Sequence, residues 1–165
     1  MQNKKGNILK RKGILIVSFI FVGMVLFSCD KQRYFEQDQP INKGIWYYKD
    51  TKSFSFEIKD SLQAFNFFIN VRNTVDYPYA NLYFFIQSEL PDGTLAKDTV
   101  ECQLADYQGK WLGEGSGELR DNRFILRRNM RFKQKGSYQF LINHGMRTDS
   151  LKGITDIGIR LETVK

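Results

Sequence analysis

The sequence has few of the side chains that hold metals or act as catalytic bases. Its 165 residues include one histidine, His144, and two cysteines, Cys29 and Cys102. Zinc sites take three or four His, Cys or carboxylate ligands, so a lone histidine and the lack of a cysteine pair exclude the common zinc motifs. A serine-hydrolase triad would have to use His144 as its base, yet no Gly-x-Ser-x-Gly motif is present. We interpret His144 as an ordinary residue at a strand end.

Other enzyme motifs are missing too. Carboxylate pairs such as Asp98 with Glu101 exist, but no neighbouring residues distinguish them as a glycosidase pair. The glycine-rich residues 109–117 do not end in Gly-Lys-Ser/Thr and lead into strand-like sequence, whereas a phosphate-binding loop leads into a helix. We expect a loop there with Trp111 tucked into it. The sequence predicts no enzyme, no metal and no cofactor.

A long hydrophobic run occurs once, at residues 13–27, directly after a basic cluster. A helix that crosses a membrane needs about 20 apolar residues, so this run is short for a permanent span. The layout is typical of a signal peptide. Leu26, Phe27, Ser28 and Cys29 follow, and they resemble the lipobox of bacterial lipoproteins, although Phe27 is bulkier than usual. The alternative is a membrane-anchor helix with an incidental cysteine.

The lipobox implies that residues 1–28 are removed and that Cys29 becomes the N-terminus. Its thiol would accept diacylglycerol, and its amine an acyl chain. Each buried methylene contributes about 0.8 kcal/mol, so two or three chains hold the protein firmly on a membrane. Cys102 would then be the only thiol, which excludes an intramolecular disulfide. We expect Cys102 to be a small buried residue in a strand.

The net charge of +7 belongs mostly to the signal segment. Residues 29–165 carry 20 Lys and Arg against 18 Asp and Glu, with the basic excess in the last 46 residues. Such a cluster of basic residues is typical of a surface that binds nucleic acid or another anionic surface. We favour a solvated strand face that neutralises the acidic half, and we expect no nucleic acid, since an exported lipoprotein seldom meets it. A contact between these basic residues and lipid headgroups or acidic polysaccharide is a further alternative. The basic residues are Arg120, Arg123, Arg127, Arg128, Arg131, Lys133 and Lys135.

Residues 29–165 are enough for one domain. The polar residues 29–42 suit an acylated N-terminus and tether, which leaves residues 43–165 for the folded part. There, apolar and polar residues alternate and turn residues recur, and no long helical periodicity occurs. We predict an all-β, antiparallel sandwich of jelly-roll or immunoglobulin-like form, with at most a helical turn near residues 145–150. Its eight predicted strands are residues 46–49, 53–58, 66–72, 82–90, 94–104, 123–128, 137–143 and 154–162.

Four aromatic residues are candidates for a partner or ligand surface. Trp46 is followed directly by two tyrosines, and three consecutive rings in a strand cannot all face the core. Tyr77, Tyr79 and Trp111 lie in predicted loops, where rings can stack on sugars or fill a partner's pocket. The alternative is that these rings close the ends of the sandwich.

Several blocks of the chain together resemble the gliding-motility lipoprotein H family of Bacteroidota, from the lipobox to the C-terminus. This resemblance implies a cell-envelope lipoprotein that belongs to the gliding machinery and works alongside type IX secretion, and it implies no catalytic residues. It also implies that a lipid anchor holds the protein in a membrane, which we expect to be the outer membrane. Its expected partners are other gliding or secretion proteins of the envelope. The blocks are RNTVDYPYANL (72–82), PDG (91–93), DT (98–99), ADYQGKWLGEGSG (105–117) and GITDIGIRLE (153–162).

Two other classes of function compete with this interpretation. A sandwich with aromatic loops suits an envelope carbohydrate-binding module, in which possible polysaccharide contacts would use the four rings. A hydrolase is the third class, and the missing catalytic constellation argues against it. Fold alone does not choose among them.

Overall fold

The structure is a computed structural model that describes residues 30–164. One compact unit comprises Gln32–Lys165. The predicted signal peptide and the lipidation residue Cys29 lie outside the described residues.

The described chain is all-β, as predicted, and every predicted strand is present. The structure adds two strands, β1 and β9, that the sequence analysis missed. The helical turn expected near residues 145–150 is not found; a 3-10 turn, η1, lies at Asn42–Gly44 instead. The strands are β1 (Arg33–Pro40), β2 (Ile45–Tyr47), β3 (Lys52–Ile58), β4 (Phe65–Thr74), β5 (Asn81–Glu89), β6 (Leu95–Gln103), β7 (Leu119–Met130), β8 (Gly136–His144), β9 (Ser150–Lys152) and β10 (Ile154–Thr163).

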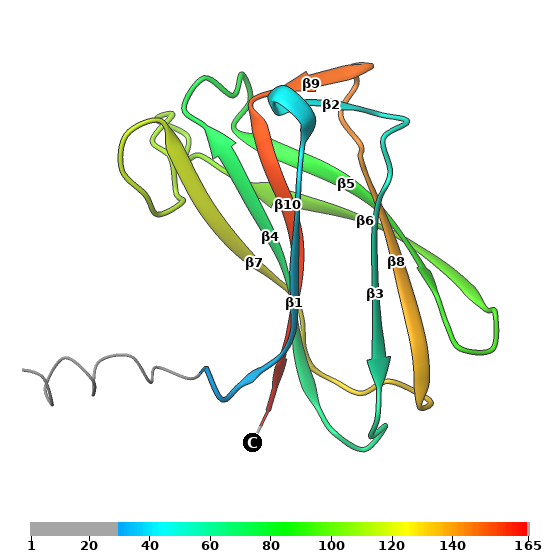
Figure 1. Cartoon of the computed structure of the whole chain (residues 1–165). Coiled ribbons are helices and arrows are strands. Elements are labelled where there is room, and N and C mark those ends of the chain that lie inside the picture. Colours follow the sequence, from blue (N-terminus) through cyan, green and yellow to red (C-terminus); the bar gives the residue numbers. More distant parts are fainter. Residues whose placement is uncertain (1–29, 165) are drawn as a thin grey trace, which may run out of the picture. The chain divides into compact units, whose positions relative to one another are not determined.

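The strands form two four-stranded sheets and one short pair (Figure 1). One sheet has the order β1-β10-β4-β7 and the other β3-β8-β5-β6, while β2 pairs with β9. All pairs are antiparallel. The first strand pairs with the last, the second with the second last, and so on inward to β5 and β6. Such a long hairpin folded into two sheets is a jelly roll.

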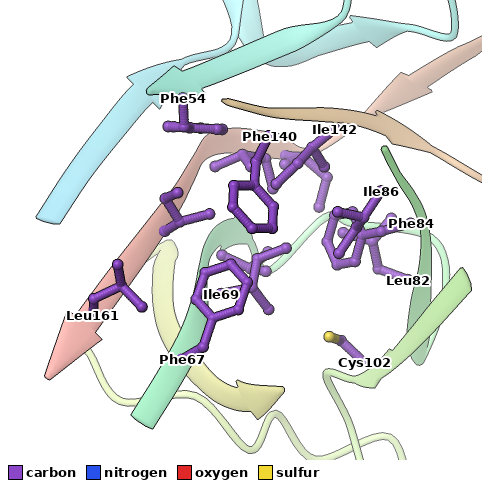
Figure 2. Close-up of a cluster of buried hydrophobic side chains, with 14 of the residues drawn as sticks. Phe54, Phe67, Ile69, Leu82, Phe84, Ile86, Cys102, Phe140, Ile142 and Leu161 are labelled. Atoms are coloured by element: carbon purple, nitrogen blue, oxygen red, sulfur yellow. The ribbon is translucent and has the colours of Figure 1, made fainter. Parts of the chain in front are cut away.

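The core lies between the two four-stranded sheets and follows the period of two in the sequence. Along β4, Phe65, Phe67, Ile69 and Val71 are buried, and the residues between them are not. The facing sheet contributes side chains such as Phe84 on β5. Figure 2 shows Phe67 and Ile69 sharing one interior with Leu82, Ile86 and Cys102, among others. Alternating apolar residues on both sheets therefore build one continuous core.

The predicted tether is wrong, because residues 33–40 form strand β1. This strand pairs with β10 over its length, with Glu36 opposite Arg160 and Asp38 opposite Gly158. Phe35 also packs on Phe56, with ring centroids 5.1 Å apart. The sequence pattern did not predict this strand, because it lies at a sheet edge and most of its side chains are polar or only half buried. The folded domain begins near residue 32 rather than 43.

We predict that a chain starting at residue 31 folds, whereas one starting at residue 43 is much less stable. The shorter chain loses the β1–β10 ladder, the Phe35 ring and the buried Ile41. The expected loss in free energy of unfolding is about 3 kcal/mol or more, since removing one buried apolar side chain alone costs about this much. Urea unfolding followed by tryptophan fluorescence measures it. Equal unfolding midpoints would show that β1 is not part of the domain.

Candidate functional site

Trp46 is not on the surface. Its side chain is completely buried, its Nε1 donates a hydrogen bond to the Asp50 carbonyl (2.7 Å), and its ring packs against Phe84 and His144. Trp46 therefore belongs to the core and is unavailable to a ligand. The expectation that one of three consecutive rings must be exposed is confirmed, since Tyr47 and Tyr48 are both accessible.

Tyr77 and Tyr79 lie in the loop between β4 and β5, and Trp111 lies in the loop between β6 and β7. These two loops are at the same end of the sandwich (Figure 1), and ring contacts join the three side chains. The centroid of the Tyr77 ring lies 5.7 Å from the centroid of the Tyr79 ring and 6.4 Å from that of the Trp111 ring. Tyr77 is buried, its hydroxyl donates to the Asn81 carbonyl (2.9 Å), and burial raises its pKa. Trp111 is half buried against the core, so of these three rings only Tyr79 is largely accessible. The cluster closes the end of the sandwich and gives no open aromatic platform.

His144 ends strand β8, as predicted, and is almost completely buried. Neither ring nitrogen has a hydrogen-bond partner among residues 30–164. Burial lowers the pKa of His144, and the neighbouring Trp46 backbone acts in the opposite sense. Because burial is the larger of these two effects, it favours the neutral form of the ring.

Cys102 is a buried residue of β6, as predicted. Burial, with a smaller contribution from Glu101, raises the pKa of its thiol to about 12. The thiol therefore stays protonated near neutral pH and is a poor nucleophile.

The glycine-rich loop leads into strand β7, as the sequence predicted, and not into a helix. Glu114 and Asp121 exchange backbone hydrogen bonds of 2.9 and 2.7 Å, which pairs the loop with the beginning of β7. Gly115 has φ +139°, and a Cβ there would meet the Leu119 carbonyl. Glycine is thus required by the turn itself.

Two of the basic residues pair with acidic residues from the acidic part of the chain, residues 29–119. Arg123 contacts Glu36 (Nη2–Oε1 2.9 Å), and Arg127 contacts Asp98 (Nη2–Oδ2 3.0 Å). The prediction of a solvated face that neutralises the acidic half is confirmed at these positions.

A groove lies where β6 and β7, each the last strand of its sheet, face one another. Its volume is about 880 Å³, and we call it the β6–β7 groove. Half-buried apolar side chains such as Val100, Phe124, Leu126 and Met130 line it, continuous with the core. Its charged lining residues are Lys97, Asp98, Glu101, Arg123, Arg127, Arg131 and Lys133.

A second hollow, of about 650 Å³, lies on the outer face of the sheet that contains β1. Its charges largely satisfy one another: Glu36 accepts from Arg123 and from the buried Arg160 (Nη1–Oε2 2.6 Å), and Arg72 donates to Asp121 (Nε–Oδ1 2.6 Å). The Asp38 carboxylate lies over Gly158, where no Cβ would fit. The hollow is therefore lined by charged side chains that form ion pairs with one another.

The sequence analysis missed both the β6–β7 groove and two exposed rings on β5. Tyr83 and Phe85 point outward from that strand, and Phe85 lines a hollow with Tyr48. The unbroken apolar run at residues 82–86 was the available signal for these rings. In a strand with one solvent-exposed face, apolar and polar residues normally alternate, and here they do not. The groove has no comparable signal, since it depends on which strands become sheet edges.

The described part of the chain has neither a cluster of metal ligands nor a helix suited to a membrane. No group of three or more His, Cys, Asp or Glu residues there could hold a metal ion. Among the same residues, no helix has the length and apolar character to cross a membrane.

The described chain is therefore an all-β jelly-roll domain with one open lateral groove. Residues 33–161 match the GldH lipoprotein family, and the chain belongs to this family. It is 31% identical over 159 residues to the gliding motility lipoprotein GldH homolog of Christiangramia forsetii, covering 92% of this chain and 97% of the relative. It is also 31% identical over 161 residues to the gliding motility lipoprotein GldH of Flavobacterium johnsoniae, covering 93% and 97%.

Among solved structures, the chain is similar to CBM28, a carbohydrate-binding module specific for non-crystalline cellulose. The TM-score is 0.44 at 6% identity, with 79% of this chain and 73% of that chain covered. A similarity this low carries no information about a shared ligand.

We predict that His144→Leu leaves stability at pH 7 unchanged or raises it, and flattens its pH dependence. Replacing a buried polar ring that makes no hydrogen bond with an apolar side chain removes a desolvation cost. Because the folded-state pKa lies below that of the unfolded chain, the unfolded chain binds more protons as the pH falls below about 6.5, and His144 then destabilises the fold. Urea midpoints above and below that pH test this. Equal pH slopes for both proteins would contradict it.

Proposed function

We propose that this protein is a lipid-anchored, non-enzymatic component of the gliding machinery, associated with type IX secretion. The observation that carries the proposal is the family match across residues 33–161, which spans nearly the whole folded domain. The two named relatives, which are matched almost end to end, are both called gliding motility lipoproteins. The buried state of His144 and Cys102, the two side chains best suited to general-base or nucleophilic chemistry, supports a binding role over an enzymatic one.

The anchoring is part of the proposal. Cys29 carries the lipid chains, and the outer membrane is the expected location. Because β1 begins at Arg33, the segment between Cys29 and the folded domain is shorter than the predicted tether. An anchored domain gains a high effective concentration beside other envelope proteins without any new contact.

Cys29→Ser should leave an uncleaved precursor that carries no lipid, because the thiol is the acceptor and the peptidase acts on the acylated form. Intact-mass spectrometry of the membrane fraction measures both features. A Cys29→Ser protein with the normal mature N-terminus would remove the lipoprotein assignment, whereas Cys102→Ser serves as the matched control and should be processed normally.

Deleting the gene in a gliding member of the family should abolish surface spreading and impair export of surface adhesins. Spreading on agar and immunoblots of exported adhesins provide the measurements. Complementation with His144→Ala or Cys102→Ala should restore both, since neither side chain has a chemical role here.

A deletion strain that spreads and exports normally would exclude this function. Loss of complementation by folded His144→Ala would instead favour an enzyme. A carbohydrate-binding role retains one observation in its favour, the exposed Phe85 beside Tyr48, and loss of complementation by folded Phe85→Ala alone would favour it.

A further inference from the structure

The β6–β7 groove is the place where the core of the domain is open at its side. Val100 and Cys102 on β6 face the interior, as do Phe124 and Leu126 on β7, and between them the two sheets have no further strand. Val100, Phe124 and Leu126 are only half buried, although they pack on the core. Apolar surface left accessible at the edge of a core is typical of a binding site.

On its groove side, the β7 backbone is paired only at Asp121 within the part of the chain that the structure describes. Asp121 directs its N–H and C=O away from β4 and toward Glu114. Backbone groups alternate in direction along a strand, so Arg123 and Ile125 direct theirs to that same free side. Beyond the bridge at Asp121, no strand of residues 30–164 lies next to β7 on that side. Such an edge can accept an added strand.

The charges around the groove are unbalanced. Five basic side chains line it against two acidic ones, Asp98 and Glu101. Arg127 and Asp98 face one another from β7 and β6 and form an ion pair of 3.0 Å across the mouth of the groove. Both side chains are more than half exposed, at 66% and 54%. An exposed pair of this kind contributes little to stability and is readily exchanged for another partner.

We propose that the groove binds an extended, acidic segment of a partner protein as an added strand on β7. Its backbone pairs with the free groups of Arg123 and Ile125, its apolar side chains cover Phe124 and Leu126, and its carboxylates replace Asp98 as the partner of Arg127. The partner is thus an acidic, extended polypeptide. The proposal rests on the proposed function only because both take the protein to act by binding other envelope proteins.

A peptide fits these features better than other occupants do. An acyl chain would cover the apolar lining but would leave the free N–H groups of β7 without partners. A peptide backbone offers both donors and acceptors at the spacing of the edge, which is the basis of strand addition in other recognition domains. A second copy of this chain would bring a basic β7 edge against another basic edge, which like-charge repulsion opposes.

The test uses the full lipidated chain in nanodiscs and a fluorescent peptide of alternating valine and glutamate. The peptide has blocked termini and is about eight residues long, the length of an ordinary strand. Fluorescence anisotropy measures binding, with empty nanodiscs and a valine–lysine peptide as controls. We expect saturable binding of the glutamate peptide alone, weakened by salt because the contacts are partly electrostatic.

The two partners of the ion pair give opposite results under this proposal. Arg127→Ala removes the cation that the peptide needs and should weaken binding roughly fivefold, whereas Asp98→Asn frees that cation and should tighten it by a similar factor. Arg128→Ala is the matched control, because Arg128 is a neighbouring exposed arginine that does not line the groove, and should change binding little. A merely structural ion pair would give the same change for both partners.

Several outcomes would overturn the proposal. These are equal binding of the lysine peptide, equal weakening by Arg127→Ala and Asp98→Asn, binding of myristate in place of the peptide, and a concentration-dependent dimer that the groove variants dissociate. Peptide binding is measured without reference to gliding. A deletion strain that still glides would therefore remove the proposed function while leaving this binding result standing.

Discussion

The pairing of the first strand with the last is the constraint on which the rest of the structure depends. Once β1 lies beside β10, the pairs β2–β9, β3–β8, β4–β7 and β5–β6 follow inward along the chain. Glu36 strengthens this outer pair from its side chain, since it accepts from Arg160 on β10 and from Arg123 on β7. Arg160 is almost completely buried, and a buried cation needs such partners. Long-range pairing of this kind also makes folding slow compared with local hairpins.

The same nested order determines where the molecule is open. Folding a long hairpin into two sheets leaves β1 and β3 as edges on one side and β6 and β7 on the other. On the first side, Phe35 and Phe56 pack together and close the core. On the second, β7 pairs with β4 along one edge, while its other edge pairs only at the Glu114–Asp121 bridge among the described residues. The core therefore stays accessible beside Phe124 and Leu126. The groove is therefore a consequence of topology and not of one unusual residue.

Much of the fold could be predicted from the sequence, because a strand with one buried face repeats every two residues. That period identified eight strands and the all-β class. It missed β1, whose Gln37, Asp38 and Gln39 give no apolar alternation, and β9, which is only three residues long. Periodicity also could not decide which of Trp46, Tyr47 and Tyr48 faces inward; β2 turns Trp46 into the core.

The functional surfaces were harder to predict for a physical reason. Tyr77 and Trp111 looked like exposed loop rings, but the two loops pack on each other, and only tertiary contacts reveal this. The groove depends on strand order, which one sequence does not contain. By contrast, the places of His144 at a strand end and of Cys102 within a strand were predicted from the local sequence, and the structure buries both side chains.

Amide hydrogen exchange along β7, resolved residue by residue, tests the free edge most directly. The account predicts strong protection of the Asn122 and Phe124 amides, which point toward β4, and fast exchange of those of Arg123 and Ile125, which point toward the groove. Addition of the glutamate peptide should then protect Arg123 and Ile125. Equal protection of all four amides in the unliganded protein would show that the edge is already covered and would contradict the account.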